Sequence, residues 1–268
     1  MFKFFILLFF SLSLLNFSSV QGVSKYGVKE GIKRAGILRK IEQGNNDEAI
    51  EELKYFAEKD DEKMQCVLAH LYLKKNDVEQ AMHWLEKSAR QGYGESQFQL
   101  GMLYSDNYIL YSNKIKVNHE KARFWLEHAA DQDHLLAQFS LGKMYYDGCG
   151  EAIPQNFLKA AYWFKKSAIQ GCVESQFYLG MMFFFGDGVG QDQEHAFYWF
   201  EKGAKQNHNP SACNLALCYL EGIGTKKNQV KAKEWLEKCA KNGNLLAPIV
   251  LEKLKRRNSV SEPEKPSS

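Results

Sequence analysis

Apolar positions recur along this chain with the spacing of an amphipathic helix. Counted from an alanine as position zero, small or apolar residues fall at positions 0, 3, 4, 7 and 8. In one copy these positions hold Ala160, Trp163, Phe164, Ser167 and Ala168. Because these spacings put all five residues on one side of a helix, the pattern predicts a helix with a single buried face.

A second helix is predicted directly after the first. Ser or Ala stands at position 15 and Leu at position 19, and four copies have an aromatic residue at position 23. A glycine-rich loop then follows, as in GCG at 148–150, GDG at 186–188 and GIG at 222–224. Glycine beyond a helix C-terminus supplies the left-handed conformation that ends the helix.

This helix pair recurs along the chain. The five tryptophans, Trp84, Trp125, Trp163, Trp199 and Trp235, are 41, 38, 36 and 36 residues apart, each with Ala three residues before it and Leu sixteen residues after it. Since the distance from Trp to Leu never varies, all length changes lie in loops. The period predicts a solenoid of stacked helix pairs, with the tryptophans in its core.

Glycine follows the Leu at position 19 in three copies, at Gly101, Gly142 and Gly180. A glycine inside a helix costs about 1 kcal/mol relative to alanine, so it needs a structural reason. We expect each glycine to let the backbone approach the large Trp of the partner helix.

The copies at the two ends are degenerate. The first begins at Ala49 and has Glu52 where Trp is expected, and the last has Pro248 in its second helix. Terminal repeats have only one neighbour, so such departures are typical of caps. The predicted organisation is a signal peptide over 1–22, a leading helix and N-terminal cap over 23–48, helix-pair repeats over 49–255, and a disordered polar tail over 256–268.

The signal peptide is predicted from the run FFILLFFSLSLL, residues 4–15, which follows the basic start MFK. This run is shorter than the roughly 20 apolar residues of a membrane span. Cleavage before Val23 would give a secreted or periplasmic product without stable membrane insertion. An uncleaved anchor is the alternative, and the lumen of the endoplasmic reticulum is another possible location.

The order of motifs, A-x2-W, then SA or AA, QG, LG and G-x-G, resembles the Sel-like repeat family, which is related to the tetratricopeptide repeats. The resemblance covers about residues 49–255. It implies an all-α fold, a right-handed superhelical solenoid of about six antiparallel helix pairs, and a role in docking or assembling other proteins. In such superhelices the first helix of each pair is expected to line the concave face.

The charge balance directs attention to one surface. The 268 residues are 45% hydrophobic and 25% charged. The net charge of +3 is too small to indicate binding to nucleic acid. Beside the buried stripe of the first helix, however, positions 2, 6 and 9 are rich in lysine and aromatic residues. The predicted protein-binding residues are Phe124, Tyr162, Lys166, Tyr198, Lys202, Lys205 and Lys238. A basic, aromatic groove suits an acidic segment of another protein; a solvated helix face is the alternative.

The loop SDNYILYSNKIKVNHEK, residues 105–121, lengthens one repeat and carries four large apolar residues together at 108–111. Insertions in solenoids often bind partners, so this loop is a second candidate surface. Folding of the loop back onto its own repeat is the equally weighted alternative.

Signs of catalysis are weak. Ser140 and Lys143 match the Ser-x-x-Lys of penicillin-interacting enzymes, and SDN at 105–107 matches a second motif of that class. The two motifs stand in the wrong order and the third, Lys-Thr-Gly, is missing. We interpret the match as a coincidence, and no cofactor is predicted.

The histidines and cysteines do not form a recognisable site. The seven histidines show no metal-binding spacing. The cysteine-rich branch of the family places Cys at positions 7 and 15, whereas here only Cys239 occupies position 7. Cys66 and Cys213 fall at position 17, where other copies carry Phe. An approach of Cys213 to Cys239 across adjacent repeats is possible, and the disulfide state is left open.

Together these observations predict an exported, non-catalytic scaffold that docks other proteins through the concave face of a helical array. A secreted effector that binds host proteins is one alternative. A cell-envelope hydrolase or penicillin-interacting protein is the other.

Overall fold

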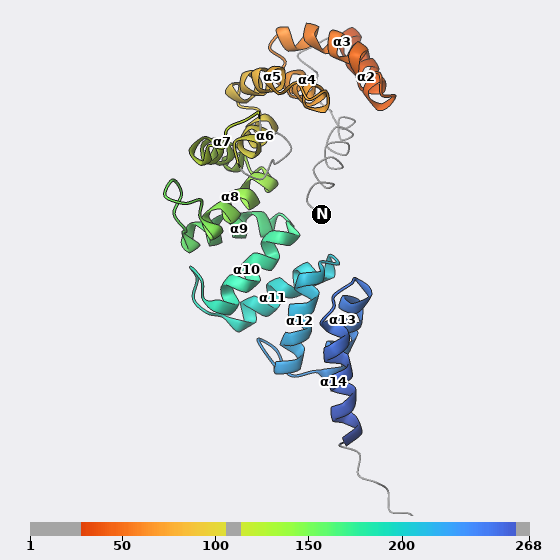
Figure 1. Cartoon of the computed structure of the whole chain (residues 1–268), viewed down its shortest axis with the longest axis vertical. Helices are drawn as coiled ribbons and strands as arrows, with labels where there is room; N and C mark the ends of the chain where they lie inside the picture. The colour runs from red at the N-terminus through yellow and green to blue at the C-terminus, as the bar shows by residue number, and fades with distance from the viewer. Residues whose placement is uncertain (1–27, 106–113, 261–268) are drawn as a thin grey trace, which may run out of the picture.

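The computed structural model describes residues 28–105 and 114–260, which form thirteen helices following one another along an arc (Figure 1). The predicted signal peptide lies outside the described residues. The helices are α2 Val28–Glu42, α3 Asn46–Glu58, α4 Glu62–Lys74, α5 Val78–Arg90, α6 Gly94–Tyr104, α7 His119–Asp131, α8 Leu135–Asp147, α9 Phe157–Ile169, α10 Val173–Phe185, α11 Gln193–Lys205, α12 Asn209–Glu221, α13 Gln229–Lys241 and α14 Ala247–Val260. None of these helices combines the length and the hydropathy that a bilayer span requires.

Each helix packs against the helix before it and the helix after it in the chain. The pairs run from α3–α4 to α13–α14, so the prediction of an all-α solenoid of about six helix pairs is confirmed. We call α5, α7, α9, α11 and α13 the Trp helices, and α4, α6, α8, α10 and α12 the Leu helices. Every Leu helix packs more extensively against the Trp helix that follows it than against the helix that precedes it.

Side-chain caps set where the Trp helices begin. The side chain of Asn156 accepts a hydrogen bond from the Lys159 backbone N–H at 2.9 Å, and Asn118, Asp192 and Asn228 act in the same way. Such caps satisfy backbone donors that have no partner within the helix. The Leu helices α10 and α12 end at glycines with positive φ, Gly186 and Gly222. The loop lengths between these signals therefore vary without changing the helices.

The glycines of the Leu helices contact a different residue from the one predicted. A Cβ on Gly142 would lie 2.5 Å from Cδ1 of Phe164, and one on Gly180 would lie 2.7 Å from Cε1 of Phe200. A Cβ on Gly101 would lie 2.6 Å from Cγ of Leu126. Each glycine therefore faces the residue directly after the Trp of the following helix, and the prediction that the Trp itself is the partner is wrong.

The physical reason is that positions 3 and 4 of the stripe do not share the same environment. Phe164 and Phe200, at position 4, are 0% and 1% exposed and are among the largest fully buried side chains. Trp84 and Trp163, at position 3, are also buried, but the other tryptophans are only half-buried. Position 4 points at the neighbouring Leu helix, whereas position 3 lies at the edge of the contact.

A ladder of buried glutamines links the helices through hydrogen bonds. In one rung, Gln138 Nε2 donates to the Ala130 carbonyl at 3.1 Å, and Gln138 Oε1 accepts from Gln170 Nε2 at 2.8 Å. Both bonds recur in the rungs of Gln65 with Gln91, Gln97 with Gln132, and Gln176 with Gln206. A buried amide without partners would be costly, so each rung favours one register between two helices.

The substitution Gly142→Ala tests the close contact with Phe164. The added methyl group overlaps the ring, so we expect the free energy of unfolding in urea to fall by about 1–3 kcal/mol. The matched control is Gly36→Ala in α2, where nothing lies within 4 Å of the added Cβ. That control is expected to raise the free energy of unfolding by up to about 1 kcal/mol through helix propensity. Equal effects of the two substitutions would contradict the packing constraint.

Candidate docking surface

The Leu helices form the inner side of the solenoid. Side chains bridge consecutive Leu helices directly: Ser140 Oγ lies 3.6 Å from Met102 Sδ, and Asn214 Nδ2 lies 3.8 Å from Met181 Sδ. The Lys143 ammonium lies 5.4 Å from the centre of the Tyr178 ring in the same way. The backbones of α8 and α10 also approach each other. In a curved stack, the layer whose helices meet is the concave one.

The Trp helices therefore form the outer layer, and the prediction that they line the concave face needs correction. The first helix of a repeat is the inner one only if the repeat is counted from the Leu helix, whereas the prediction counted it from the Trp helix. Because the sequence period is the same from any starting point, it does not show which helix comes first.

The predicted aromatic residues lie in one row on this outer layer. We call Phe124, Tyr162, Lys166, Tyr198, Lys202 and Lys238 the outer row. Phe124, Tyr162 and Tyr198 occupy the same repeat position on α7, α9 and α11, and they are 49%, 53% and 45% exposed. Large aromatic side chains left half in water at three equivalent places form an unusual surface feature.

Each of these rings is held by the Trp that follows it. The ring centres of Tyr162 and Trp163 are 4.9 Å apart with the planes at 77°, and those of Tyr198 and Trp199 are 5.0 Å apart at 80°. Phe124 and Trp125 repeat this geometry at 5.0 Å and 79°. Edge-to-face contact of this kind is favourable, so each exposed ring packs against the Trp beside it.

Lysines stand over the same rings. Lys166 Nζ lies 5.2 Å from the centres of both the Tyr162 and Trp163 rings, and Lys202 Nζ lies 5.5 Å from the Tyr198 ring. Lys238 Nζ lies 4.0 Å from the Trp235 ring. A cation within about 6 Å of a ring face is attracted to it, so these ammonium groups are partly positioned. Predicted Lys205 differs, because its Nζ forms an ion pair with Glu201 at 2.9 Å.

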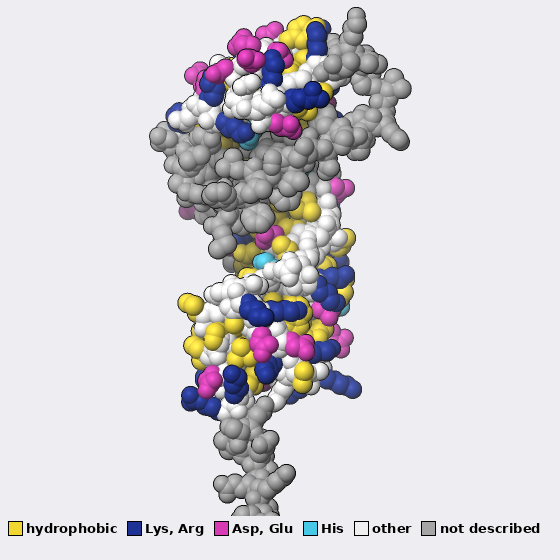
Figure 2. Space-filling view, turned by 90° about the vertical axis from the view of Figure 1, so that its right-hand side faces the viewer, with side chains coloured by type: hydrophobic (Ala, Val, Ile, Leu, Met, Phe, Trp, Pro, Cys, Tyr) yellow, Lys and Arg dark blue, Asp and Glu magenta, His cyan; other side chains and the backbone are white. Residues whose placement is uncertain are grey.

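Apolar residues on the open side of the solenoid were not among the predicted binding residues. Figure 2, which views that side, shows hydrophobic side chains gathered over the C-terminal half of the molecule. Leu217 of α12 is large and 45% exposed, at the repeat position of Met102 and Met181, which contact the next Leu helix. Apolar residues at a second helical position, such as Met102, Met181 and Leu217 at position 21, carried this signal in the sequence.

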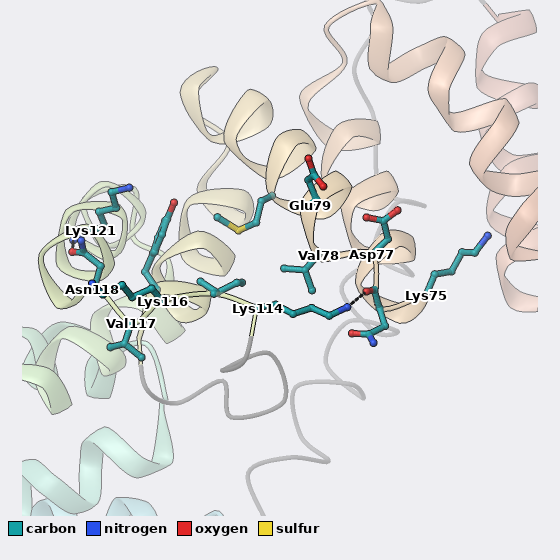
Figure 3. A pocket seen from close by; sticks show the side chains of 13 residues that line it. Lys75, Asp77, Val78, Glu79, Lys114, Lys116, Val117, Asn118 and Lys121 are labelled. Carbon is teal, nitrogen blue, oxygen red and sulfur yellow. Dashed lines mark hydrogen bonds between the residues drawn. The ribbon is translucent and has the colours of Figure 1, made fainter.

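The described part of the long loop packs against its own repeat and against the repeat before it. Ile115 is buried, Asn118 N–H donates to the Tyr104 carbonyl at 2.8 Å, and Lys114 Nζ donates to the Asn76 carbonyl at 2.6 Å. These residues border an open hollow of about 900 Å³ beside the start of α5 (Figure 3). Its charged lining residues are of both signs: Lys75, Asp77, Glu79, Lys114, Lys116 and Lys121. The apolar run at 108–111 lies outside the described residues.

The residues of the proposed hydrolase motif are engaged in other contacts. Lys143 forms an ion pair with Asp147, one turn further along α8, and Ser140 Oγ contacts Met102 Sδ. Ser105 is buried and donates to the Met102 carbonyl at 2.7 Å. The described residues contain no cluster of three or more potential metal ligands.

The partly buried Glu95 of α6 is hydrogen-bonded to His134 at the start of α8 and interacts with His70 of α4. Burial is the largest influence on the pKa of Glu95 and would raise it, but the hydrogen bond to His134 Nε2 at 3.2 Å, the charge interactions with His134 and His70 and the hydrogen bond to Gln99 together lower it. Burial, assisted by nearby Lys74, lowers the pKa of His70 to about 4. His70 is therefore neutral in the folded protein at neutral pH.

Comparison with known proteins agrees with this architecture. The sequence model of the Sel1 repeat matches residues 66–93, 94–134, 135–172, 173–208 and 209–244. Its last four units start at or next to the first residue of α6, α8, α10 and α12, so each pairs a Leu helix with the Trp helix after it. This division agrees with the tighter packing of each Leu helix against the following Trp helix. It differs from the predicted division, in which a repeat begins with the Trp helix.

Solved structures with this fold are also similar. A Sel1 repeat protein from Oxalobacter formigenes is 29% identical, with a TM-score of 0.62 over 75% of this chain and 57% of its own. A protective antigen of uropathogenic Escherichia coli with an SLR fold is 25% identical, with a TM-score of 0.54 over 81% of this chain and 53% of its own. This chain thus spans little more than half the length of either protein. A search of the curated proteins finds no match.

The partly buried His70 predicts a loss of stability on acidification. Its pKa is about 4 in the folded protein and about 6.5 in the unfolded chain, so the unfolded chain takes up the proton first as the pH falls. This contribution is complete above about pH 6.5 and is lost towards pH 4. His70→Gln is expected to reduce the stability difference between pH 7 and pH 5, measured by urea unfolding, by up to about 2 kcal/mol. Replacement of the exposed His83 is the control, and an equal reduction there would contradict the assignment.

Proposed function

The chain belongs to the Sel1 repeat family, and from this membership we propose that it is an exported, non-catalytic scaffold that docks a partner protein through the outer row. Proteins of this family are helical repeat proteins that typically serve protein–protein interaction. Helix-pair arrays of this kind offer extended and rigid surfaces rather than enclosed pockets.

The observation that carries this proposal is the repetition of exposed, ordered aromatic rings with a lysine beside them. Tyr162 with Lys166 and Tyr198 with Lys202 present the same pair of groups on consecutive Trp helices. Phe124 extends the aromatic row to α7, and Lys238 extends the basic row to α13. Exposed aromatic residues fixed in place bind at low entropic cost, which is why they are common at interfaces.

The chemistry of the outer row favours an acidic segment that runs across the Trp helices. Carboxylates of such a segment would pair with the lysines, while its apolar residues would cover the faces of Tyr162 and Tyr198. Charge complementarity of this kind mainly increases the association rate and the selectivity, and ring contacts add affinity. Binding is therefore expected to weaken as the salt concentration rises.

Export is supported by the apolar run at residues 4–15, which follows a basic start and is too short for a comfortable membrane span. A periplasmic or secreted location would bring the outer row into contact with envelope or extracellular proteins. The same surface would serve a secreted effector with a host partner, so the two cases differ in the partner and not in the mechanism.

The outer row is tested by charge reversal with a closely matched control. The test variant is Lys166→Glu, Lys202→Glu, Lys238→Glu. The control variant is Lys121→Glu, Lys159→Glu, Lys231→Glu. Each control lysine also lies over a ring, at 5.0, 5.0 and 5.2 Å from Tyr104, Tyr145 and Tyr219, but at a different repeat position. Both variants therefore reverse three positive charges, and they lose four and three lysine–ring contacts respectively.

Residues 23–268 are first used to capture a partner from envelope and culture extracts, and its affinity for each variant is then measured by titration. The test variant is expected to bind about 100-fold more weakly, from about 1 kcal/mol per lysine, and the control to bind like the wild type. Circular dichroism confirms that the variants remain helical. Equal binding by test and control variants would exclude the outer row as the docking surface.

A further inference from the structure

The last interface between a Leu helix and the following Trp helix contains two neighbouring cysteines, Cys213 on α12 and Cys239 on α13. A hydrogen bond between their thiols shifts the pKa of both. Asn209 lies against both: its Oδ1 is 3.9 Å from Cys213 Sγ, and its backbone carbonyl oxygen is 3.9 Å from Cys239 Sγ. Asn244 donates to Cys213 Sγ at 3.3 Å from the loop that leads into α14. Polar groups thus surround the two sulfur atoms.

This pair replaces a different combination at the other interfaces. In repeat register, Cys213 stands at position 17 of one unit and Cys239 at position 7 of the next. The equivalent pairs are Cys66 with Ser88, Phe98 with Ala129, Phe139 with Ser167, and Phe177 with Gly203. Among these five pairs of positions, the pair at the α12–α13 interface alone has cysteine at both.

The same interface lacks a rung of the glutamine ladder. Ala212 and Asn242 stand where the other interfaces have the two glutamines. Asn209 Nδ2 donates only a long bond, 3.4 Å, to the Asn242 carbonyl. The C-terminal end of the solenoid thus has a pair of thiols at the interface where the repeated amide bond is missing.

We propose that Cys213 and Cys239 form a reversible disulfide that links α12 to α13 and holds the C-terminal cap of the solenoid in place under oxidising conditions. This bond joins a Leu helix to the Trp helix that follows it. It therefore differs from a bridge between positions 7 and 15 of one unit, where this chain has, for example, Ser88 and Ser96 with their Oγ atoms 2.7 Å apart. The proposal does not depend on the proposed docking function.

The two thiols differ in a way that sets the order of reaction. Cys213 is only partly buried, and contact with Cys239 lowers its pKa, so it is the thiol that becomes a nucleophile. Cys239 is 0% exposed, and the contact with Cys213 together with burial raises its pKa. Burial raises the pKa of Cys66 to about 12 and that of Cys218 to about 11, and it also raises the pKa of Cys172. Those three thiols are expected to stay reduced.

The oxidant is a small-molecule disulfide such as oxidised glutathione. The Cys213 thiolate attacks one glutathione sulfur, which forms a mixed disulfide and releases one glutathione thiolate. The Cys239 thiol then loses its proton to water and attacks Cys213 Sγ, which forms the intramolecular disulfide and releases the second glutathione thiolate. The protein loses two electrons and two protons, and the two released thiolates carry the electrons. Excess reduced glutathione reverses both steps.

The experiment places the full chain in a series of glutathione redox buffers and identifies each cysteine's state by differential alkylation and mass spectrometry. We expect Cys213 and Cys239 to disappear together into one cross-linked peptide pair. Their loss is expected at a ratio of oxidised to reduced glutathione about tenfold lower than any oxidation of Cys66, Cys172 or Cys218. Accumulation of glutathione on Cys213, a disulfide with another cysteine, or two persistent thiols would each overturn the proposal.

Hydrogen exchange on the oxidised and reduced protein tests the effect on the cap. Amides of α13 and α14 are expected to exchange about tenfold more slowly after oxidation, and those of α4 to α9 at an unchanged rate. Cys239→Ala is expected to abolish the difference. The buried Cys218→Ala, on the same helix as Cys213, is expected to preserve it. Because the wild-type comparison alone is decisive, identical exchange in its two redox states would overturn the structural role even if a variant failed to fold.

Discussion

The contact between a small residue on each Leu helix and a large buried residue on the following Trp helix determines how the repeats stack. Gly142 against Phe164 and Gly180 against Phe200 bring two helices closer than a side chain at the glycine would allow. When each copy is counted from the alanine before its tryptophan, this contact lies between one copy and the next. It therefore couples neighbouring copies. Burial of the aromatic ring supplies the favourable energy, and the absence of a Cβ supplies the room.

The fold could be predicted from the sequence because its signals are local and repeated. Helical spacing, glycine-rich loops and a constant Trp-to-Leu distance depend on residues close together in the chain. Two other features depend on which residues meet across units. The partner of Gly142 is Phe164 and not Trp163. The sequence could not distinguish the two, because both are large apolar residues at adjacent positions. The glutamine ladder was also not predicted, since Gln138 and Gln170 are 32 residues apart.

The candidate surface shows the same division. The exposed positions of Phe124, Tyr162 and Tyr198 follow from their place beside the buried stripe. Their location on the outer side of the solenoid could not be predicted, because the sequence period is the same whichever helix is counted first. The approach of Cys213 to Cys239 was open from sequence because both fall at positions that face the neighbouring unit, and the structure brings the two thiols into contact.

The ending of the glutamine ladder at the last interface gives the molecule a mechanical direction. A stack in which each unit contacts only its neighbours comes apart one unit at a time when its ends are pulled. Four interfaces contain a hydrogen-bonded pair of glutamine side chains that must break in shear, as Gln170 and Gln138 do, but the interface between α12 and α13 contains none. With Cys213 and Cys239 reduced, the α12–α13 interface of the described array should therefore separate under tension before the four that contain a glutamine pair, and a load applied at the C-terminal end would be relieved before it reached the aromatic row.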